Sequence, residues 1–249
     1  MALLSHTNLS LISMIFLSGS LVMLWFIILS GVTHTSPLRQ THFLRADTSG
    51  ITGARPISQW TYFHICGDGN IDCGPARPGL PLGDAWSGNP TGAPVELIGN
   101  YGGGTTSFTF WYMWRFGWVF FLIALLFEIL AFFSGFLACC SRLGSAVSGL
   151  ISLIALFFLT IAVSLMTATF VKMRNAFAAD GRDASLGTYA FGFAWGAWTA
   201  LLISTILFCI GRHSSKRDVT PRTQSRWRRT KSTRSARSYD GRRVKEEYP

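Results

Sequence analysis

Few side chains in this 249-residue chain could do chemistry in water, and the clearest are Cys66 and Cys73. They bound the run Cys-Gly-Asp-Gly-Asn-Ile-Asp-Cys, whose glycines and asparagine suit a tight turn. A disulfide would close this ring and stabilise it by roughly 2.5 kcal/mol in the chain-entropy treatment. The alternative is a metal site that adds His64, Asp68 or Asp72 to the thiols. We expect the disulfide, because a soft-ligand site needs a second pair at suitable spacing and the sequence has none.

Glu128 is the only formal charge inside four long apolar runs of the sequence. At the middle of the second run an ionised side chain costs about 3 kcal/mol on insertion scales, so lipid favours the neutral acid. One interpretation is a proton or ion relay; the other is a carboxyl that hydrogen-bonds a hydroxyl of a neighbouring helix. The hydroxyls considered for that contact are Ser152, Thr160, Thr199 and Ser204. We expect the structural role, because transport paths need several polar groups.

Catalytic machinery is missing from the aqueous segments of the sequence. They contain no nucleophile with a base, no metal-binding quartet and no pair of acids in a suitable context. The glycine-rich run at residues 101–106 is not a phosphate loop, since no Gly-Lys-Ser/Thr follows it. We therefore expect no enzymatic activity, no catalytic residue, no metal and no cofactor.

Four apolar runs must position these residues. Each is about 24 to 26 residues long, roughly 36 to 39 Å as a helix, against a hydrocarbon core of about 30 Å. We therefore predict an all-α membrane protein: a four-helix transmembrane bundle with a small disulfide-stapled, β-containing extracellular loop domain. The predicted spans are residues 9–32, which end a first segment 1–32, and residues 116–140, 146–171 and 186–211.

The segments between the spans differ in length and composition. Residues 33–115 form the only sizeable aqueous segment before the tail. Within it, residues 59–65 and 105–112 are expected to be strands, because aromatic and β-branched residues dominate them. Residues 141–145 and 172–185 form two short loops.

Charge sets the predicted orientation. Residues 212–249 hold 13 Lys and Arg against 4 Asp and Glu, and so supply +9 of the net charge of +10. The positive-inside rule places this tail, the amino terminus and the loop 141–145 in the cytosol. The segments 33–115 and 172–185 then lie outside. The three basic residues of the segment 172–185 disagree with this rule. The tail has almost no aliphatic residues and is expected to be disordered.

Small residues recur at a spacing of four along the last span, at Gly192, Gly196, Ala200 and Ser204. Such a stripe lets the backbone of a partner helix approach closely. We expect it to pack within the bundle. The alternative is a face for self-association into a homo-oligomer.

Three cysteines fall at the predicted cytosolic ends of helices. They are Cys139, Cys140 and Cys209. Thiols at the membrane edge are acceptors for S-palmitoylation, and a buried inert thiol is the alternative.

The basic tail is the segment most suggestive of function. A cluster of positive charge would attract anionic lipid, each basic residue near the surface contributing about 1 kcal/mol. The cluster consists of Arg226, Arg228, Arg229 and Lys231. Phosphorylation of the interspersed Ser and Thr would oppose this attraction, and about five phosphates would cancel the charge of the tail. The alternative is that the charges only set topology; nucleic-acid binding is not expected.

Residues 60–66, Trp-Thr-Tyr-Phe-His-Ile-Cys, are followed by Cys73 and two prolines, and the last span begins with an aromatic run at 189–195. Together with the four spans and the basic tail, these residues resemble the fungal four-span proteins of eisosomes, the Sur-seven and PalI group. The resemblance covers residues 9–211 and carries over Trp60, Cys66 and Cys73 as motif residues. The outer loop also resembles that of claudins, but its looser spacing carries over no claudin function.

This resemblance implies a plasma-membrane organiser without catalytic activity, linked to endocytosis and cell-wall assembly. The implied partners are anionic lipid, sphingolipid, and eisosome or other plasma-membrane proteins. Two alternatives stay open. One is a PalI-type sensor of ambient pH or wall stress, and the other is a transporter or channel regulator that uses Glu128.

Overall fold

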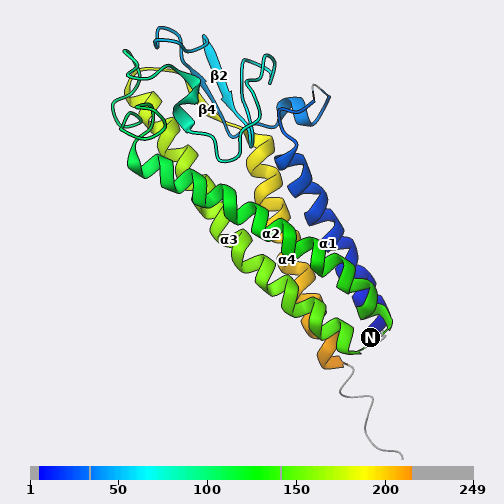
Figure 1. Ribbon diagram of the computed structural model, residues 1–249. Coiled ribbons are helices and arrows are strands. Elements are labelled where there is room, and N and C mark those ends of the chain that lie inside the picture. Colours follow the sequence, from blue (N-terminus) through cyan, green and yellow to red (C-terminus); the bar gives the residue numbers. More distant parts are fainter. Residues whose placement is uncertain (1–5, 34, 141, 215–249) are drawn as a thin grey trace, which may run out of the picture. The chain divides into compact units, whose positions relative to one another are not determined.

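The computed structural model describes residues 6–33, 35–140 and 142–214, and four long helices dominate it (Figure 1). They are α1 (His6–Ile28), α2 (Phe108–Cys140), α3 (Arg142–Ala179) and α4 (Thr188–Ser214). Each contains a segment long and apolar enough to cross a membrane: Asn8–Ile28, Phe108–Phe136, Gly144–Ala179 and Thr188–Ile210. The predicted four-helix bundle is confirmed.

Helices α2 and α3 form an antiparallel pair along the bundle. Near the end of α2, the Ser148 hydroxyl of α3 donates to the Ala131 carbonyl of α2 at 3.2 Å. Near its beginning, a Cβ built on Gly117 would lie 3.2 Å from the Met166 side chain of α3. Small residues thus allow close approach where no aqueous hydrophobic effect drives helix association.

The beginning of α2 corrects the prediction of a strand over residues 105–112. The helix already begins at Phe108. The segments 29–33, 35–107 and 180–187 form the domain at one end of the bundle, which is called the outer domain after its predicted side of the membrane. Phe110 and Trp114 lie four residues apart and therefore share one face of the helix, which is buried in this domain at 6% and 1% exposure. Helix α3 likewise runs past its predicted span, to Ala179, and its end packs against the sheet.

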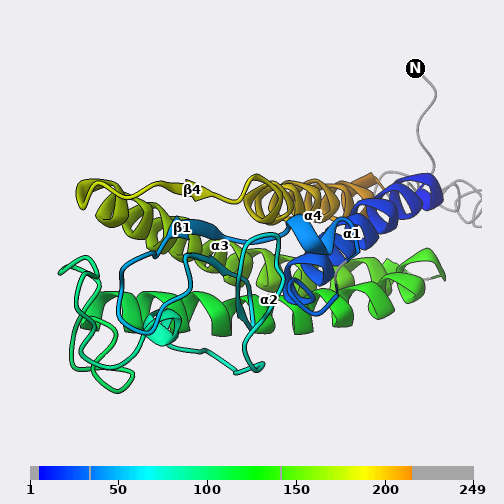
Figure 2. The same cartoon turned by 90° about the horizontal axis from the view of Figure 1, so that it is seen from above.

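A four-stranded antiparallel sheet, in the order β3-β2-β1-β4, organises the outer domain (Figure 2). The strands are β1 (Leu44–Asp47), β2 (Ile57–Trp60), β3 (Ile65–Cys66) and β4 (Ala184–Leu186). The predicted strand 59–65 is therefore two strands. A turn separates them, in which the Thr61 amide donates to the His64 carbonyl at 2.9 Å.

Strand β4 comes from the short loop between α3 and α4, where no strand was predicted. In the register of the sheet, Leu44 of β1 lies opposite Trp60 on one side and Leu186 on the other. The next residue, Gly187, has no room for a Cβ against the His42 carbonyl. Both outer segments therefore build one domain and lie on the same side of the membrane.

An aromatic core joins the sheet to the helices. Phe43, just before β1, stacks on Phe170 of α3 with ring centroids 5.0 Å apart, and Trp114 of α2 meets Phe170 edge-on at 5.3 Å. Both phenylalanines are fully buried. The outer domain is thus seated on α2 and α3 by apolar burial that continues from the bundle, with β1 and β4 over the end of α3 in Figure 2.

Candidate functional site

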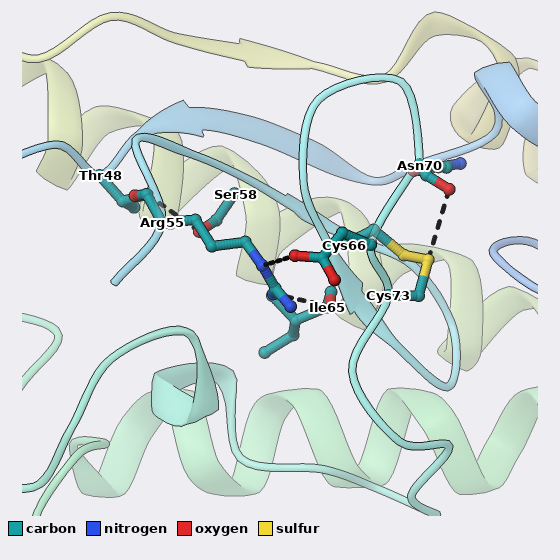
Figure 3. A network of polar contacts seen from close by, with 8 residues as sticks. Thr48, Arg55, Ser58, Ile65, Cys66, Asn70 and Cys73 are labelled. Atoms are coloured by element: carbon teal, nitrogen blue, oxygen red, sulfur yellow. Dashed lines mark hydrogen bonds and ion pairs between the residues drawn. A yellow bond between two sulfur atoms is a disulfide. The ribbon is translucent and has the colours of Figure 1, made fainter. Parts of the chain in front are cut away.

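The two cysteines of the outer domain form a disulfide, as predicted. Cys66 ends β3 and is bonded to Cys73 (Figure 3). Inside the ring, Asn70 is fully buried, and its side-chain amide donates to the carbonyls of Leu38 at 3.1 Å and Thr41 at 2.9 Å. Its φ of 52° is left-handed, a conformation that asparagine tolerates better than most residues. The ring is therefore anchored to the chain between α1 and β1.

Ion pairs occupy the carboxylates that were considered as metal ligands. Asp68 accepts a hydrogen bond from Arg45 Nε at 2.8 Å, and Asp72 accepts one from Arg55 Nε at 2.9 Å. The hydrogen bond from the Arg45 guanidinium lowers the pKa of Asp68. The His64 ring nitrogen Nδ1 instead lies 2.8 Å from a backbone carbonyl oxygen. Within the described part of the chain, no group of three His, Cys, Asp or Glu residues is arranged to hold a metal.

Trp60, a motif residue of the family resemblance, lies at the centre of the outer domain. Its side chain is 1% exposed, and its indole N–H donates to the Leu82 carbonyl at 2.9 Å, in the short 3-10 helix Leu82–Ala85. Its ring lies against Trp86 and Phe177, with centroids 6.4 and 6.0 Å away. This one side chain joins the sheet, the 3-10 helix and the end of α3.

Tyr62 is a structural residue that the sequence analysis did not single out. It is fully buried, and its hydroxyl donates to the Trp118 carbonyl of α2 at 2.6 Å, while its ring stacks on the Trp118 ring at 5.5 Å. Its amide donates to the Ser30 hydroxyl, just beyond α1, at 3.3 Å. Burial raises the pKa of the Tyr62 hydroxyl. Its spacing of two from Trp60, on an aromatic run, was the signal available in the sequence.

Arg182 connects the two outer segments. From the sequence, it was only one of three basic residues whose position disagreed with the positive-inside rule. From the loop between α3 and β4, its guanidinium donates to the carbonyls of Ser49 at 2.6 Å and Gly92 at 2.7 Å. It also pairs with Asp180 at 3.1 Å. Its side chain is only 17% exposed. Arg182 is thus a partly buried link that holds the loops of the outer domain together.

Glu128 is fully buried in the bundle, and its hydrogen-bond partner lies on a different helix from those expected. The Ser20 hydroxyl of α1 lies 3.2 Å from Glu128 Oε1 and 2.9 Å from the Ala197 carbonyl of α4. The four hydroxyls named from the sequence make no hydrogen bond to Glu128 within the described residues. Oε2 of Glu128 has no partner there either. One polar contact therefore links α1, α2 and α4 in the middle of the bundle.

The stripe of small residues on α4 lies partly against α1. A Cβ on Gly196 would lie 3.0 Å from Met23 Sδ of α1, and the Ser204 hydroxyl donates to the Ser13 carbonyl of α1 at 2.9 Å. Ala200 is half-buried. Gly192 is exposed, with no atom within 4 Å of an added Cβ.

The remaining predicted positions lie at the helix ends that the sequence analysis expected to be cytosolic, and beyond. Cys209 is a free, exposed thiol near the end of α4. The side chains of Cys139 and Cys140 lie outside those that the structure describes, and so does the basic cluster of Arg226, Arg228, Arg229 and Lys231. Their acylation and lipid binding stay predictions.

The sequence is similar to known proteins of one family. A profile of the SUR7/PalI family matches residues 9–207. Protein SUR7 of Candida albicans is 35% identical over 207 residues, which cover 82% of this chain and 74% of the relative. SUR7 family protein FMP45 of Saccharomyces cerevisiae is 32% identical over 203 residues, covering 79% and 64%. An uncharacterized plasma membrane protein of the same yeast is 28% identical over 215 residues, covering 83% and 69%.

Proposed function

The chain belongs to the SUR7/PalI family, as its residues predicted, and from this premise we propose that it is a non-catalytic organiser of the plasma membrane. In this proposal it forms part of eisosome-type cortical domains and acts by lateral packing of its helices. It would contribute there to endocytosis and cell-wall assembly. The family's proteins are membrane proteins, and a relative is named for the plasma membrane.

The observation that carries the proposal is the apolar outer surface of the helix bundle. Large apolar side chains point outward from every helix, including Ile15, Phe133, Leu150 and Ile206 at 68, 64, 60 and 48% exposure. The interior is filled by aliphatic, small and aromatic side chains, together with buried Ser and Thr hydroxyls and Glu128. Such a surface meets lipid and neighbouring helices, and van der Waals fit then decides which neighbours stay.

The orientation and the lipid contacts are part of the same proposal. Disulfides persist in oxidising compartments, so the Cys66–Cys73 bond supports an outer domain that faces away from the cytosol. Both termini would then be cytosolic, and the basic tail would lie beside the anionic inner leaflet, where its positive charges attract lipid.

Live imaging of a carboxy-terminally tagged copy tests the organiser. We expect immobile cortical spots with little fluorescence recovery after bleaching; an even or internal distribution would contradict the proposal. Loss of signalling after removal of residues 212–249, with clustering intact, would instead favour the sensor.

The transporter or channel-regulator alternative rests on Glu128, whose Oε2 is buried without a partner among the described residues. Ser152 Oγ on α3 is also buried and unpartnered there. Glu128→Gln separates the two functions. We expect normal clustering and unchanged ion and proton flux, whereas loss of a measurable flux with intact clusters would overturn the organiser.

The tail has its own test, which uses purified protein and liposomes. Replacing the Arg and Lys of residues 212–249 with Gln removes 13 positive charges, and we expect much weaker association with anionic liposomes at moderate salt. As the control, the same number of uncharged residues of this tail, Ser and Thr among them, is replaced with Gln, which leaves the charge unchanged. Equal binding by the Gln variant would exclude lipid binding by charge.

A further inference from the structure

A cavity of about 450 Å³ opens on the outer domain beside the disulfide ring. Its volume lies within the range of small-molecule sites. The wall combines charged and apolar groups, among them Arg55, Ile65, Pro75, Arg77, Leu80 and Asp84. We propose that this cavity binds a neutral, polyhydroxylated ligand, a saccharide of one or two rings.

Charge pairing in the wall favours a neutral ligand. Arg55 is paired with Asp72 at 2.9 Å, and Arg77 with Asp84 at 3.0 Å, so neither guanidinium offers an uncompensated charge. An anion would have to compete with a carboxylate that is already in place. A sugar hydroxyl both donates and accepts, so it can bond an arginine and an aspartate of the same pair without separating them.

Donor groups remain available in these pairs. Arg77 contacts Asp84 through Nη1 only, and its side chain is 60% exposed at the cavity. Its other guanidinium N–H groups can therefore reach a ligand. Asp84 is 28% exposed and can accept through its second oxygen. Arg77 and Asp84 therefore present hydrogen-bond donors and an acceptor side by side, which suits neighbouring hydroxyls on one saccharide ring.

The rest of the wall supplies apolar surface. Ile65 and Leu80 are 6% and 3% exposed and line the cavity together with Pro75 and Ala85. A saccharide ring carries C–H groups on its faces and hydroxyls on its rim. Such a ring would lay one face on Pro75, the exposed apolar residue of this wall, while its rim meets the ion pairs.

The wall is held in place without a ligand. The Trp114 indole N–H donates to the Leu80 carbonyl at 2.8 Å, and the Gly74 amide donates to the Ile65 carbonyl at 2.9 Å. The disulfide fixes the loop that carries Gly74. A preformed wall loses little conformational entropy on binding, which favours even a ligand with few contacts.

The test uses the full chain in lipid nanodiscs and saturation-transfer NMR with soluble disaccharides of glucose, mannose and N-acetylglucosamine. We expect saturation transfer from at least one disaccharide and about tenfold weaker binding in Arg77→Gln, because a hydrogen bond to a charged donor is lost. Asp84→Asn keeps the side-chain volume, so it serves as a second variant should Arg77→Gln fold poorly. A parallel arm with a glycosylated lipid in the nanodisc separates a lipid-linked sugar from a soluble glycan.

Arg45→Gln is the matched control, because Arg45 forms the same kind of ion pair with Asp68 but does not line the cavity. Saccharide binding should be unchanged in this variant. Three results would overturn the proposal: no saturation transfer from any saccharide, equal affinity in Arg77→Gln and the parent chain, or displacement of the saccharide by inorganic phosphate.

Discussion

The outer domain and the helix bundle both contain many aromatic residues but place them in different environments. In the outer domain, buried aromatic side chains satisfy their polar atoms: the indoles of Trp60 and Trp114 and the hydroxyl of Tyr62 each donate to a backbone carbonyl. In the bundle, Trp195 is 43% exposed on the surface and lies beside Trp198. Aromatic rings hold the first region together, whereas in the second some rings lie in the interior and others, such as Trp195, lie on the surface.

Solvent explains the difference. The outer domain has short strands and long irregular stretches, so hydrophobic burial and side-chain hydrogen bonds must fix its loops in water. The bundle satisfies its backbone within the helices, and lipid gives its apolar side chains no reason to move inward. Single side chains should therefore matter more in the outer domain than in the bundle.

The largest effect should come from one tryptophan in each region. Trp60→Ala removes a buried ring and its hydrogen bond, and should destabilise the outer domain by about 3 to 5 kcal/mol. Trp195→Ala removes an exposed ring and should cost less than about 1 kcal/mol. Thermal unfolding by circular dichroism, with trypsin cleavage of the outer domain, measures both. Equal losses in the two variants would contradict the comparison.

Loss of the disulfide should rank second. Replacing Cys66 and Cys73 with serine opens the ring and should cost about 2.5 kcal/mol, since the unfolded chain regains conformational freedom. Cys209→Ser is the matched control, because this thiol is free and exposed on α4. The same unfolding assay and digestion report the result. Equal resistance of the outer domain to trypsin, which would cut at arginines such as Arg55 and Arg77, would show that Asn70 and the ion pairs suffice without the disulfide.

The bundle and the disulfide were predictable because their signals are local. An apolar run of sufficient length must cross lipid as a helix, whatever lies around it. Two cysteines in a short Gly- and Asn-containing segment can close a ring without distant partners. Strand β4 and the link through Arg182 have no such signal, because each forms only when a distant segment supplies the other half of the contact.

Residues 108–112 show how composition misleads when tertiary packing decides. Their aromatic residues favour a strand, yet they form the first turns of α2. Helix geometry puts Phe110 and Trp114 on one buried face and leaves Tyr112, between them, 40% exposed, whereas in a strand all three side chains would share one face. The Glu128 contact was predictable in kind only: a buried acid needs a polar partner, but the packing of α1 decides that Ser20 supplies it.

Two serines of α1, Ser18 and Ser20, test how much a single polar contact stabilises the bundle. Ser20→Ala removes the contacts to Glu128 and to the Ala197 carbonyl, and should cost about 1 kcal/mol, within the range of about 0.6 to 2 kcal/mol for hydrogen bonds in membranes. Ser18→Ala, on the same helix, removes an exposed hydroxyl that bonds only its own helix at Ile15. It should have no measurable effect. A double-mutant cycle with Glu128→Gln would assign the share that belongs to Glu128, and a loss above about 3 kcal/mol would place this polar contact on a level with the outer domain.

The smallest effect should be a pH dependence of the outer domain. Burial, and then the nearby charge of Arg45, lower the pKa of His42 from its usual 6.5. The unfolded chain therefore takes up a proton at a higher pH than the folded chain, and the free energy of unfolding should fall as pH drops below about 6.5. The lowered pKa of Asp68 acts only below about 3.8, so a series from pH 7 to 5 separates the two groups.

His42→Gln removes the titration and should flatten this slope. Asp68 and Arg45 also face His42, so Arg45→Gln should reduce the slope without abolishing it. Urea unfolding of the outer domain, monitored by tryptophan fluorescence at each pH, measures the effect. A slope that survives unchanged in His42→Gln would assign the pH dependence to another group of the outer domain.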